Sequence, residues 1–373
     1  MTFATFMDLA LYHPEGGYYT RSEMKVGKGG DFYTSPTIQA AFGTCMARQI
    51  VQGWELMGRP TELSLLELGA GGGQLAHQVL SELSRYRRRW KKLRYAIWER
   101  SGALRDRQAA LLSSFASTVH WIADLEELAP EGRWEGIVFS NELFDALPFH
   151  RVAVAGGQLV EIGVHFHEGS WRQVAIPPST PRLLQVLSEE GISLQEGQQA
   201  EVGLAAQDLM ERLGRWLGRA LMLTVDYGGS AEQVYASHRK RGSLRSYYHQ
   251  LLVPDPLACP GEQDLTADVD FTGLMAAGER GGLRTLGVVP QGEFLKGLGI
   301  QALEQEAIKE VESRLEASQI AFDFRRLYEP QAMGDRFLVL LQIKAVDITT
   351  KRLAGLGGEA VSAPSRHGFW PWK

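Results

Sequence analysis

The chain has 373 residues, of which 44% are hydrophobic and 22% charged, and its formal net charge is −5. This composition is typical of a soluble globular protein with one large domain or two, and its acidic balance argues against a dedicated nucleic-acid binder, which is usually basic. The two cysteines, Cys45 and Cys259, lack metal-ligand spacing and indicate a reducing compartment without a disulfide framework. No apolar run reaches the length of a membrane span, and the N-terminus lacks a secretion or transit signal. We therefore expect a cytoplasmic protein without membrane insertion.

The first 60 residues precede the first predicted sheet strand. We expect residues 1–60 to form a helical and loop extension that completes the site formed by the main domain. Within it, 27–36 is predicted to be an irregular loop, and apolar residues at helical spacing predict a helix over 37–54.

From residue 61 onward, short apolar strands alternate with helical patterns. The strands are predicted at 63–68, 93–98, 119–122 and 136–140, and the helices at 74–84 and 102–114. Alternation at this interval predicts a doubly wound, mostly parallel α/β sheet. We place this domain over 61–345 and a flexible tail over 346–373.

Two insertions interrupt the domain, at about 151–218 and 229–300. In the first, apolar and polar residues alternate on both sides of Gly156-Gly157, which predicts a hairpin over 151–166. In the second, 229–265 has little periodicity and is predicted to be a long loop of the kind that forms lids or binding surfaces. The remaining elements are predicted as a helix over 201–218, a buried strand over 220–228, a helix over 301–318 and a strand over 336–343.

The most informative motif follows the first predicted strand, where Glu67 precedes a turn that contains Gly69, Gly71 and Gly73. Strand, glycine turn and helix together are how an α/β sheet brings a small molecule against bare backbone. The spacing Gly-x-Gly-x-Gly differs from the dinucleotide fingerprint Gly-x-Gly-x-x-Gly. A carboxylate at Glu67 would also repel a pyrophosphate, whereas it suits an amine or a sulfonium. The turn therefore indicates S-adenosylmethionine rather than NAD.

Acidic residues stand at the ends of successive predicted strands. They are Glu67, Glu99, Asp124, Glu142 and Asp226. Because the carboxyl ends of parallel strands share one edge, we expect these side chains to line one crevice. Ionised carboxylates accept hydrogen bonds only, so they suit a ligand rich in donors. Glu99 is expected to accept both ribose hydroxyls, Asp124 to contact the adenine and Glu67 to offset the methionine ammonium. A single acid at a strand end can equally be a helix cap.

The fourth predicted strand ends in Asn141 and Glu142, and Asp145 follows three residues later. A methyl acceptor would lie at this edge, with Asn141 beside the cofactor. Glu142 and Asp145 could clamp a planar cation in bidentate fashion as the catalytic pair. The alternative is that Asp145 caps the next segment while Glu142 alone faces the site. The sequence leaves both interpretations open.

Two further patterns are expected to be structural. The basic run over 85–94 lies between a helix end and a strand start, where a solvated turn is favoured over nucleic-acid binding. His165 and His167 share one face of a predicted strand, but no third ligand is spaced with them, so we expect no metal site.

Two longer stretches are specific enough to indicate a protein family. They are Gly30-Asp31-Phe32-Tyr33-Thr34-Ser35-Pro36 and Asn141-Glu142-Leu143-Phe144-Asp145-Ala146-Leu147-Pro148. With Glu67-Leu68-Gly69 and Asp226-Tyr227-Gly228, they resemble the MidA-like methyltransferases over about residues 6–342. The mitochondrial members of that family serve in respiratory complex I assembly.

The resemblance implies a class I, Rossmann-like methyltransferase fold and S-adenosyl-L-methionine as cofactor. It also implies a protein substrate, a complex I subunit, methylated on an arginine. The loop over 31–35 is expected to fold over the site, with Asp31 as a catalytic candidate and Thr34 and Ser35 beside the cofactor.

Three features depart from the family pattern. Ala70 and Gly72 stand where the family usually has a proline and a basic residue, and Thr37 stands where it has an acid. Because the chain begins at the family domain without a presequence, we expect a bacterial protein.

Two alternative functions are open at this point. A non-catalytic assembly chaperone could retain the fold, but a pure binding module has no need for a charged crevice. A small-molecule methyltransferase is the other alternative, although the predicted hairpin and long loop enlarge the rim in a way that suits a protein acceptor better. The aromatic residues of 369–372 leave self-association as a homodimer open.

Overall fold

The computed structural model describes residues 1–21, 40–249, 251–348 and 353–357. The predicted loop over 27–36 and the tail aromatics at 369–372 lie outside these residues.

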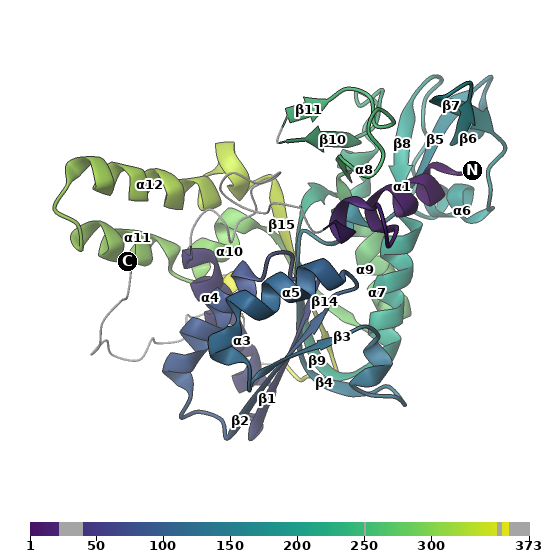
Figure 1. The fold of residues 1–373 in the computed structure, drawn as a ribbon. Helices are drawn as coiled ribbons and strands as arrows, with labels where there is room; N and C mark the ends of the chain where they lie inside the picture. The colour runs from purple at the N-terminus through teal and green to yellow at the C-terminus, as the bar shows by residue number, and fades with distance from the viewer. Residues whose placement is uncertain (22–39, 250, 349–352, 358–373) are drawn as a thin grey trace.

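The main sheet has the strand order β14-β15-β9-β4-β1-β2-β3 (Figure 1). Its strands are β1 (Glu62–Leu68), β2 (Lys92–Trp98), β3 (Val119–Ile122), β4 (Trp134–Asn141), β9 (Leu217–Gly229), β14 (Arg284–Pro290) and β15 (Phe337–Lys344), and the short β13 (Val269–Asp270) pairs with β9. All neighbours from β9 to β3 are parallel, whereas β15 is antiparallel to both β9 and β14. The predicted mostly parallel, class I Rossmann-like sheet is confirmed.

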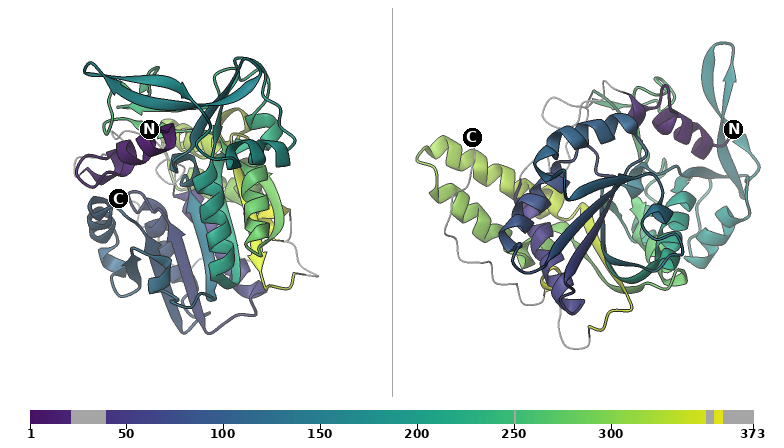
Figure 2. Two further views of the ribbon diagram at one scale, coloured as in Figure 1. Left: turned by 90° about the vertical axis from the view of Figure 1, so that its right-hand side faces the viewer. Right: turned by 60° about the horizontal axis from the view of Figure 1, so that its bottom comes forward.

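Helices cover both faces of this sheet and make it a three-layer structure (Figures 1 and 2). The principal helices are α3 (Ala41–Leu56), α4 (Gln74–Leu83), α5 (Gly102–Leu111), α6 (Arg182–Glu189), α7 (Leu204–Trp216), α8 (Ala231–Val234), α9 (Phe271–Arg280), α10 (Gln291–Gly297), α11 (Ile300–Lys309) and α12 (Arg314–Tyr328). One core cluster joins α3, α4 and α10–α12 to the sheet, and a second joins α7 and α9 to its other face.

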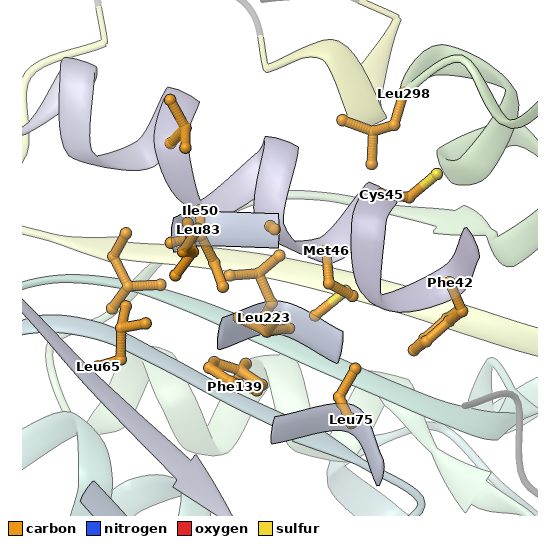
Figure 3. Close-up of a cluster of buried hydrophobic side chains, with 14 of the residues drawn as sticks. Phe42, Cys45, Met46, Ile50, Leu65, Leu75, Leu83, Phe139, Leu223 and Leu298 are labelled. Atoms are coloured by element: carbon orange, nitrogen blue, oxygen red, sulfur yellow. The ribbon is translucent and has the colours of Figure 1, made fainter. Parts of the chain in front are cut away.

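The packing of α3 follows from its apolar spacing. Phe42, Met46 and Ile50 recur every four residues, so they lie on one face of the helix. All three are buried and belong to the same core cluster as Phe139 and Leu223 (Figure 3). Helix α3 is therefore part of the core of the sheet domain, although it lies within the segment expected to be an extension.

The predicted single helix over 301–318 is wrong. The structure has two helices, α11 and α12, which pair side by side (Figure 1). The break falls just before α12, where the Ser313 hydroxyl accepts the backbone N–H of Glu316 at 3.4 Å and begins the new helix.

The first insertion forms a separate small sheet. The predicted hairpin is confirmed as β5 (His150–Ala155) and β6 (Gln158–His167), whose turn residues Gly156 and Gly157 both have positive φ. It extends into a four-stranded sheet with β7 (Ser170–Ile176) and β8 (Gln199–Val202). Helix α1 (Phe3–Tyr12) buries Phe3, Phe6 and Met7 in a cluster that includes Val164 of β6.

The segment 229–265, predicted to be a long loop, is largely ordered instead. It holds α8 and the strands β10 (Arg245–Tyr248), β11 (Leu251–Val253) and β12 (Asp264–Thr266), which form an antiparallel sheet in the order β11-β10-β12. The strands have only three or four residues each, too few to give a clear alternation in the sequence.

Part of the basic run is neutralised on the surface. Arg85, Arg89 and Arg94 pair with Glu82, Glu55 and Glu62. Within the described ranges, the helices are all too short or too polar to cross a membrane.

Candidate functional site

A cavity of about 580 Å³ lies at the carboxyl ends of the parallel strands. Residues from the ends of β1, β2, β4 and β9 contribute to its wall, together with residues of α1, β10, β12 and the start of β15. Of the predicted site residues, those that line it are Glu67, Gly69, Gly71, Glu99, Asn141, Glu142 and Asp145. Asp31, Thr34 and Ser35 lie outside the described residues.

The glycine turn has a backbone that favours glycine at all three predicted positions. Gly69, Gly71 and Gly73 have φ of 67°, 52° and 86°, in the left-handed region. A Cβ on Gly71 would meet nothing within 4 Å, so this residue leaves open space in the cavity wall. Gly73 has another role, since it does not line the cavity and a Cβ there would lie 3.3 Å from the Gln108 side chain.

Gln108 braces this turn, a role that analysis of strand ends does not find. Its Nε2 donates to the Gly71 carbonyl oxygen at 2.8 Å and to Glu99 Oε2 at 3.1 Å, while its Oε1 accepts from Trp121 Nε1 at 2.8 Å. The side chain is fully buried. Gln108 therefore fixes the glycine turn, Glu99 and β3 relative to one another.

Glu67 and Glu99 are both buried at the cavity. Glu67, 2% exposed, accepts a hydrogen bond from the Tyr95 hydroxyl at 2.6 Å. Burial raises the pKa of its carboxyl to about 7, despite that hydrogen bond, which lowers it. Glu99 accepts the backbone N–H of Ser101 at 2.9 Å, and burial raises its pKa as well. Both carboxyls are thus suited to a ligand that brings hydrogen-bond donors or positive charge.

The expectation that Asp124 lines the same crevice is wrong. Its side chain is 64% exposed and pairs with Arg212 at 2.9 Å. Asp124 also forms a capping box with Glu127 at a short 3₁₀ turn. Asp124 therefore caps the segment that follows it, which was the alternative role for an acid at a strand end.

Asn141 and Glu142 close β4 beside the glycine turn. The Asn141 amide donates to Glu142 Oε1 at 2.9 Å. Glu142 has a φ of 53°, which is sterically unfavourable for a residue with a Cβ, and its N–H donates to the Val225 carbonyl at 2.9 Å. Strained backbone of this kind clusters at functional sites, and here it directs the chain after β4 along the cavity wall.

Asp145 faces the same cavity, which answers the choice that the sequence left open. It is 5% exposed, accepts a hydrogen bond from the Tyr227 hydroxyl at 2.5 Å and lines the cavity with Glu142. Asp226 takes the capping role instead. It is fully buried and accepts the N–H groups of Phe144 at 2.9 Å and Asp145 at 3.3 Å. The expectation that Asp226 itself lines the crevice is therefore wrong.

The small three-stranded sheet supplies a wall of the cavity. Arg245 is paired with Thr266, and Tyr247 with Asp264, across β10 and β12, and all four residues line the cavity. Residues directly opposite on paired strands share one face. The sequence analysis expected 229–265 to be a lid or binding loop, and the structure places part of this segment in the cavity wall as strands.

The N-terminal segment closes another side. The Tyr12 hydroxyl donates to the Ala146 carbonyl at 2.8 Å, and the Tyr19 hydroxyl donates to Asp264 Oδ1 at 2.7 Å. Their rings stack 5.5 Å apart. Tyr12 and Tyr19, from the segment before the sheet domain, thus contribute directly to the cavity wall.

A second cavity, of about 700 Å³, lies between α6 and α7 and contains none of the predicted site residues. Its arginines are paired with acids on the surface, for example Arg182 with Asp208 at 2.6 Å and Arg280 with Glu211 at 3.0 Å. Within the described residues, no group of three or more His, Cys, Asp or Glu side chains is placed to hold a metal ion.

The first cavity fits S-adenosylmethionine. Gly71 leaves space where a side chain would otherwise lie, and Glu67 and Glu99 are acceptors for the ammonium and hydroxyl groups of such a ligand. The side-chain oxygens Asp145 Oδ1 and Asn141 Oδ1 are buried without a hydrogen-bond partner among the described residues. Buried polar atoms of this kind call for a partner, and a donor-rich ligand supplies one.

Comparison with known proteins also indicates S-adenosylmethionine as the ligand. Residues 45–289 match the family described as "Putative S-adenosyl-L-methionine-dependent methyltransferase". The Drosophila melanogaster protein arginine methyltransferase NDUFAF7 homolog, mitochondrial, is 32% identical over 376 residues, covering 92% of this chain and 81% of the relative. The Mus musculus protein arginine methyltransferase NDUFAF7, mitochondrial, is 30% identical over 367 residues, covering 90% and 79%. These relatives are named as mitochondrial. The cytoplasmic location expected from the sequence of this chain stays a prediction.

A solved structure from Burkholderia thailandensis, bound to S-adenosyl-homocysteine, is similar throughout, with a TM-score of 0.85 at 29% identity over 97% of this chain and 92% of that one. S-adenosyl-homocysteine is what S-adenosylmethionine becomes when its methyl group is transferred. The chain therefore belongs to this family of S-adenosyl-L-methionine-dependent methyltransferases and takes S-adenosylmethionine as its cofactor.

Proposed function

We propose that this enzyme transfers the methyl group to a guanidino nitrogen of an arginine in a protein substrate. The observation that carries the proposal is the pair of carboxyl side chains, Glu142 and Asp145, on one wall of the cavity beyond the glycine turn. A guanidinium presents five donors in a fixed planar fork, which suits two carboxylates better than an amine or a hydroxyl does.

The chemistry requires such a pair. A guanidinium is charged at any working pH and is a poor nucleophile. Carboxylates that hold the positive charge on two nitrogens allow a lone pair to develop on the third. Positioning of the reacting atoms supplies a large part of the acceleration, up to ~7–11 kcal/mol in well-oriented systems. An acceptor carboxylate would instead be repelled by Glu142 and Asp145.

Two further observations support a protein acceptor. The curated relatives are named protein arginine methyltransferases, and the cavity wall includes side chains from α1 and from the β10–β12 sheet, outside the main sheet. The resemblance to MidA-like proteins implies a respiratory complex I subunit as the acceptor.

The test combines methyl-labelled S-adenosylmethionine with recombinant complex I subunits, and maps the modified residue by mass spectrometry. We expect label on arginine. Glu142→Gln should lower kcat by about 100-fold or more while the cofactor Kd, measured by calorimetry, stays near the wild-type value.

Glu126→Gln is the matched control, since Glu126 is an exposed acid paired with Arg212 away from the cavity. Glu126→Gln should change neither kcat nor the cofactor Kd. Label on another residue type, or equal losses of turnover and cofactor affinity in Glu142→Gln, would contradict the proposal.

A further inference from the structure

Asp145 has two oxygens in different environments. Oδ2 accepts the Tyr227 hydroxyl at 2.5 Å, whereas Oδ1 is buried and has no hydrogen-bond partner among the described residues. The backbone N–H of Asp145 is held by Asp226. The carboxyl group is therefore fixed by its neighbours, and its second oxygen is buried and unpaired in a residue that lines the cavity.

The Tyr227 ring is contacted by an arginine that belongs to a network of ion pairs. The Arg245 guanidinium lies 4.6 Å from the centre of the Tyr227 ring, and it pairs with Asp268 at 2.6 Å. Arg239 pairs with the other oxygen of Asp268 at 2.5 Å. A cation against the ring face and a hydroxyl on Asp145 act in the same direction, since both stabilise the negative charge of the carboxylate.

We propose that Asp145 is the proton acceptor of the reaction and that Tyr227 and Arg245 are its positioning residues. This inference rests on the proposed function. The cofactor supplies the methyl group. As the new N–C bond forms and the S–C bond breaks with its electron pair left on sulfur, one N–H proton of the acceptor passes to Oδ1 of Asp145. The methylated guanidinium keeps one positive charge, and Asp145 becomes neutral.

The two acids of the pair are not equivalent in this assignment. Glu142 accepts a hydrogen bond from the neighbouring Asn141 and is suited to hold the acceptor in place. Burial raises the pKa of Asp145 to about 6, and the Tyr227 hydrogen bond and the Arg245 charge keep it from rising further. Asp145 is thus ionised at neutral pH, yet it is a stronger base than a solvated aspartate, which is what general-base catalysis requires.

The charged and titratable groups around Asp145 come from several elements. They are Glu142 after β4, Asp226 and Tyr227 on β9, Arg245 on β10, Asp264 on β12, Tyr12 on α1 and Tyr19 on the short helix after it. Asp226 is fully buried, and its own pKa is raised by burial and by Asp145. Arg245 is the cation of the set, so the Tyr227–Arg245 side is where substitutions change the ionisation of Asp145 most directly.

The first test needs no acceptor. The Asp145 carboxyl is titrated by ¹³C NMR in the full-length protein labelled at aspartate carboxyl carbons, with Asp145→Asn used to assign its signal. We expect a midpoint near pH 6. Tyr227→Phe removes the hydrogen bond that lowers the pKa, so the midpoint should move to higher pH.

The second test is the pH dependence of kcat/KM on an arginine-containing acceptor. Asp145→Asn should lower kcat by about 10²–10⁴-fold. For a rise of about one pKa unit from about 6, Tyr227→Phe should be roughly threefold slower near pH 6.5, approach tenfold slower below about pH 5, and recover toward the wild-type rate near pH 8.5, since one unit of pKa changes the ionised fraction by up to tenfold. A loss from misfolding would not recover with pH.

Tyr86→Phe is the control, because Tyr86 is buried and its hydroxyl has no hydrogen-bond partner among the described residues. It should leave both the titration and the pH profile unchanged. An Asp145 midpoint or a pH profile that is the same in Tyr227→Phe and wild type would overturn the assignment. Absence of methylarginine with a normal Tyr227 effect on the titration would instead refute the proposed function and leave the coupling of the two residues intact.

Discussion

A substitution at Gly71 distinguishes an effect on cofactor binding from an effect on folding. Its φ is 52°, and a Cβ there would meet nothing within 4 Å. In Gly71→Val we therefore expect loss of S-adenosylmethionine binding by calorimetry, because the new side chain occupies the space left for the ligand, with a folding cost of about 1–2 kcal/mol from the left-handed backbone.

Gly156→Val is a matched control. Gly156 has a φ of 60° and equally open surroundings, but it lies at the tip of the β5–β6 hairpin, outside the residues that line the cavity. It should have a similar thermal destabilisation and normal cofactor affinity. Loss of binding in both variants would show that backbone strain, and not occupied space, is responsible.

Glu67 makes cofactor affinity depend on pH. Burial raises its pKa to about 7, so in the free protein the group is substantially protonated below neutral pH. A cationic ligand group favours the ionised form, so binding must release a proton there, and the affinity should weaken by up to tenfold per unit as pH falls below about 7.

Calorimetry in buffers of different ionisation enthalpy measures this released proton directly. Tyr95→Phe removes a hydrogen bond that lowers the Glu67 pKa, so its pH dependence should shift upward. Glu67→Gln should abolish the dependence. An affinity that is constant from pH 5.5 to 8 in the wild type would show that Glu67 does not face the ligand charge.

The candidate site was partly predictable at this scale, and the reason is geometric. The parallel sheet brings strand ends to one edge, so Glu67, Glu99 and Glu142 do meet at one cavity. The sequence does not show whether the side chain of an acid near a strand end faces the cavity or hydrogen-bonds to a neighbouring turn. Asp124 follows β3 and Asp226 lies near the end of β9, but both bond to neighbouring turns instead.

At the scale of elements, the helical hairpin α11–α12 depends on a cap. Apolar spacing alone predicted one helix, but Ser313 interrupts it and accepts the Glu316 N–H. Ser313→Ala should lower the free energy of unfolding by about 1 kcal/mol, measured by denaturant titration. The control is Ser318→Ala in the exposed interior of α12, where the hydroxyl bonds the Arg314 carbonyl. There we expect no loss, since alanine favours helix more than serine does. Equal losses in the two variants would show that Ser313 does not act as a cap.

Elements with strong local signals were predicted and those that depend on partners were not. The β5–β6 hairpin has a Gly156-Gly157 turn that fixes its geometry. Strands β10, β11 and β12 are short and are stabilised by pairing with one another, so 229–265 gave no periodic signal. The sequence therefore predicted a binding loop here, but the paired strands that form the cavity wall became visible only in the structure.

For the whole molecule, a pair of partly buried acids makes stability depend on pH. Glu190 at the end of α6 and Asp270 at the start of α9 lie together beside Gly273, where a Cβ would meet both carboxyl groups at 2.9 Å. Burial raises the pKa of both groups, and the Asp270 charge raises that of Glu190 further. The folded state therefore binds a proton that the unfolded chain releases at lower pH.

The sign of the effect follows from linkage. A carboxyl whose pKa is raised by folding contributes stability at low pH, and that contribution is lost as pH rises from its usual range through the folded-state value. We expect the free energy of unfolding to fall as pH rises from about 5 toward 9. Glu190→Gln keeps a donor for Asp270 and cannot ionise in the unfolded chain, so it should flatten this slope and raise stability at pH 8 by roughly 1 kcal/mol. Glu279→Gln, at an exposed position on α9, should leave the slope unchanged. A slope of equal steepness in Glu190→Gln and wild type would place the titration elsewhere, in acids of the cavity such as Glu67.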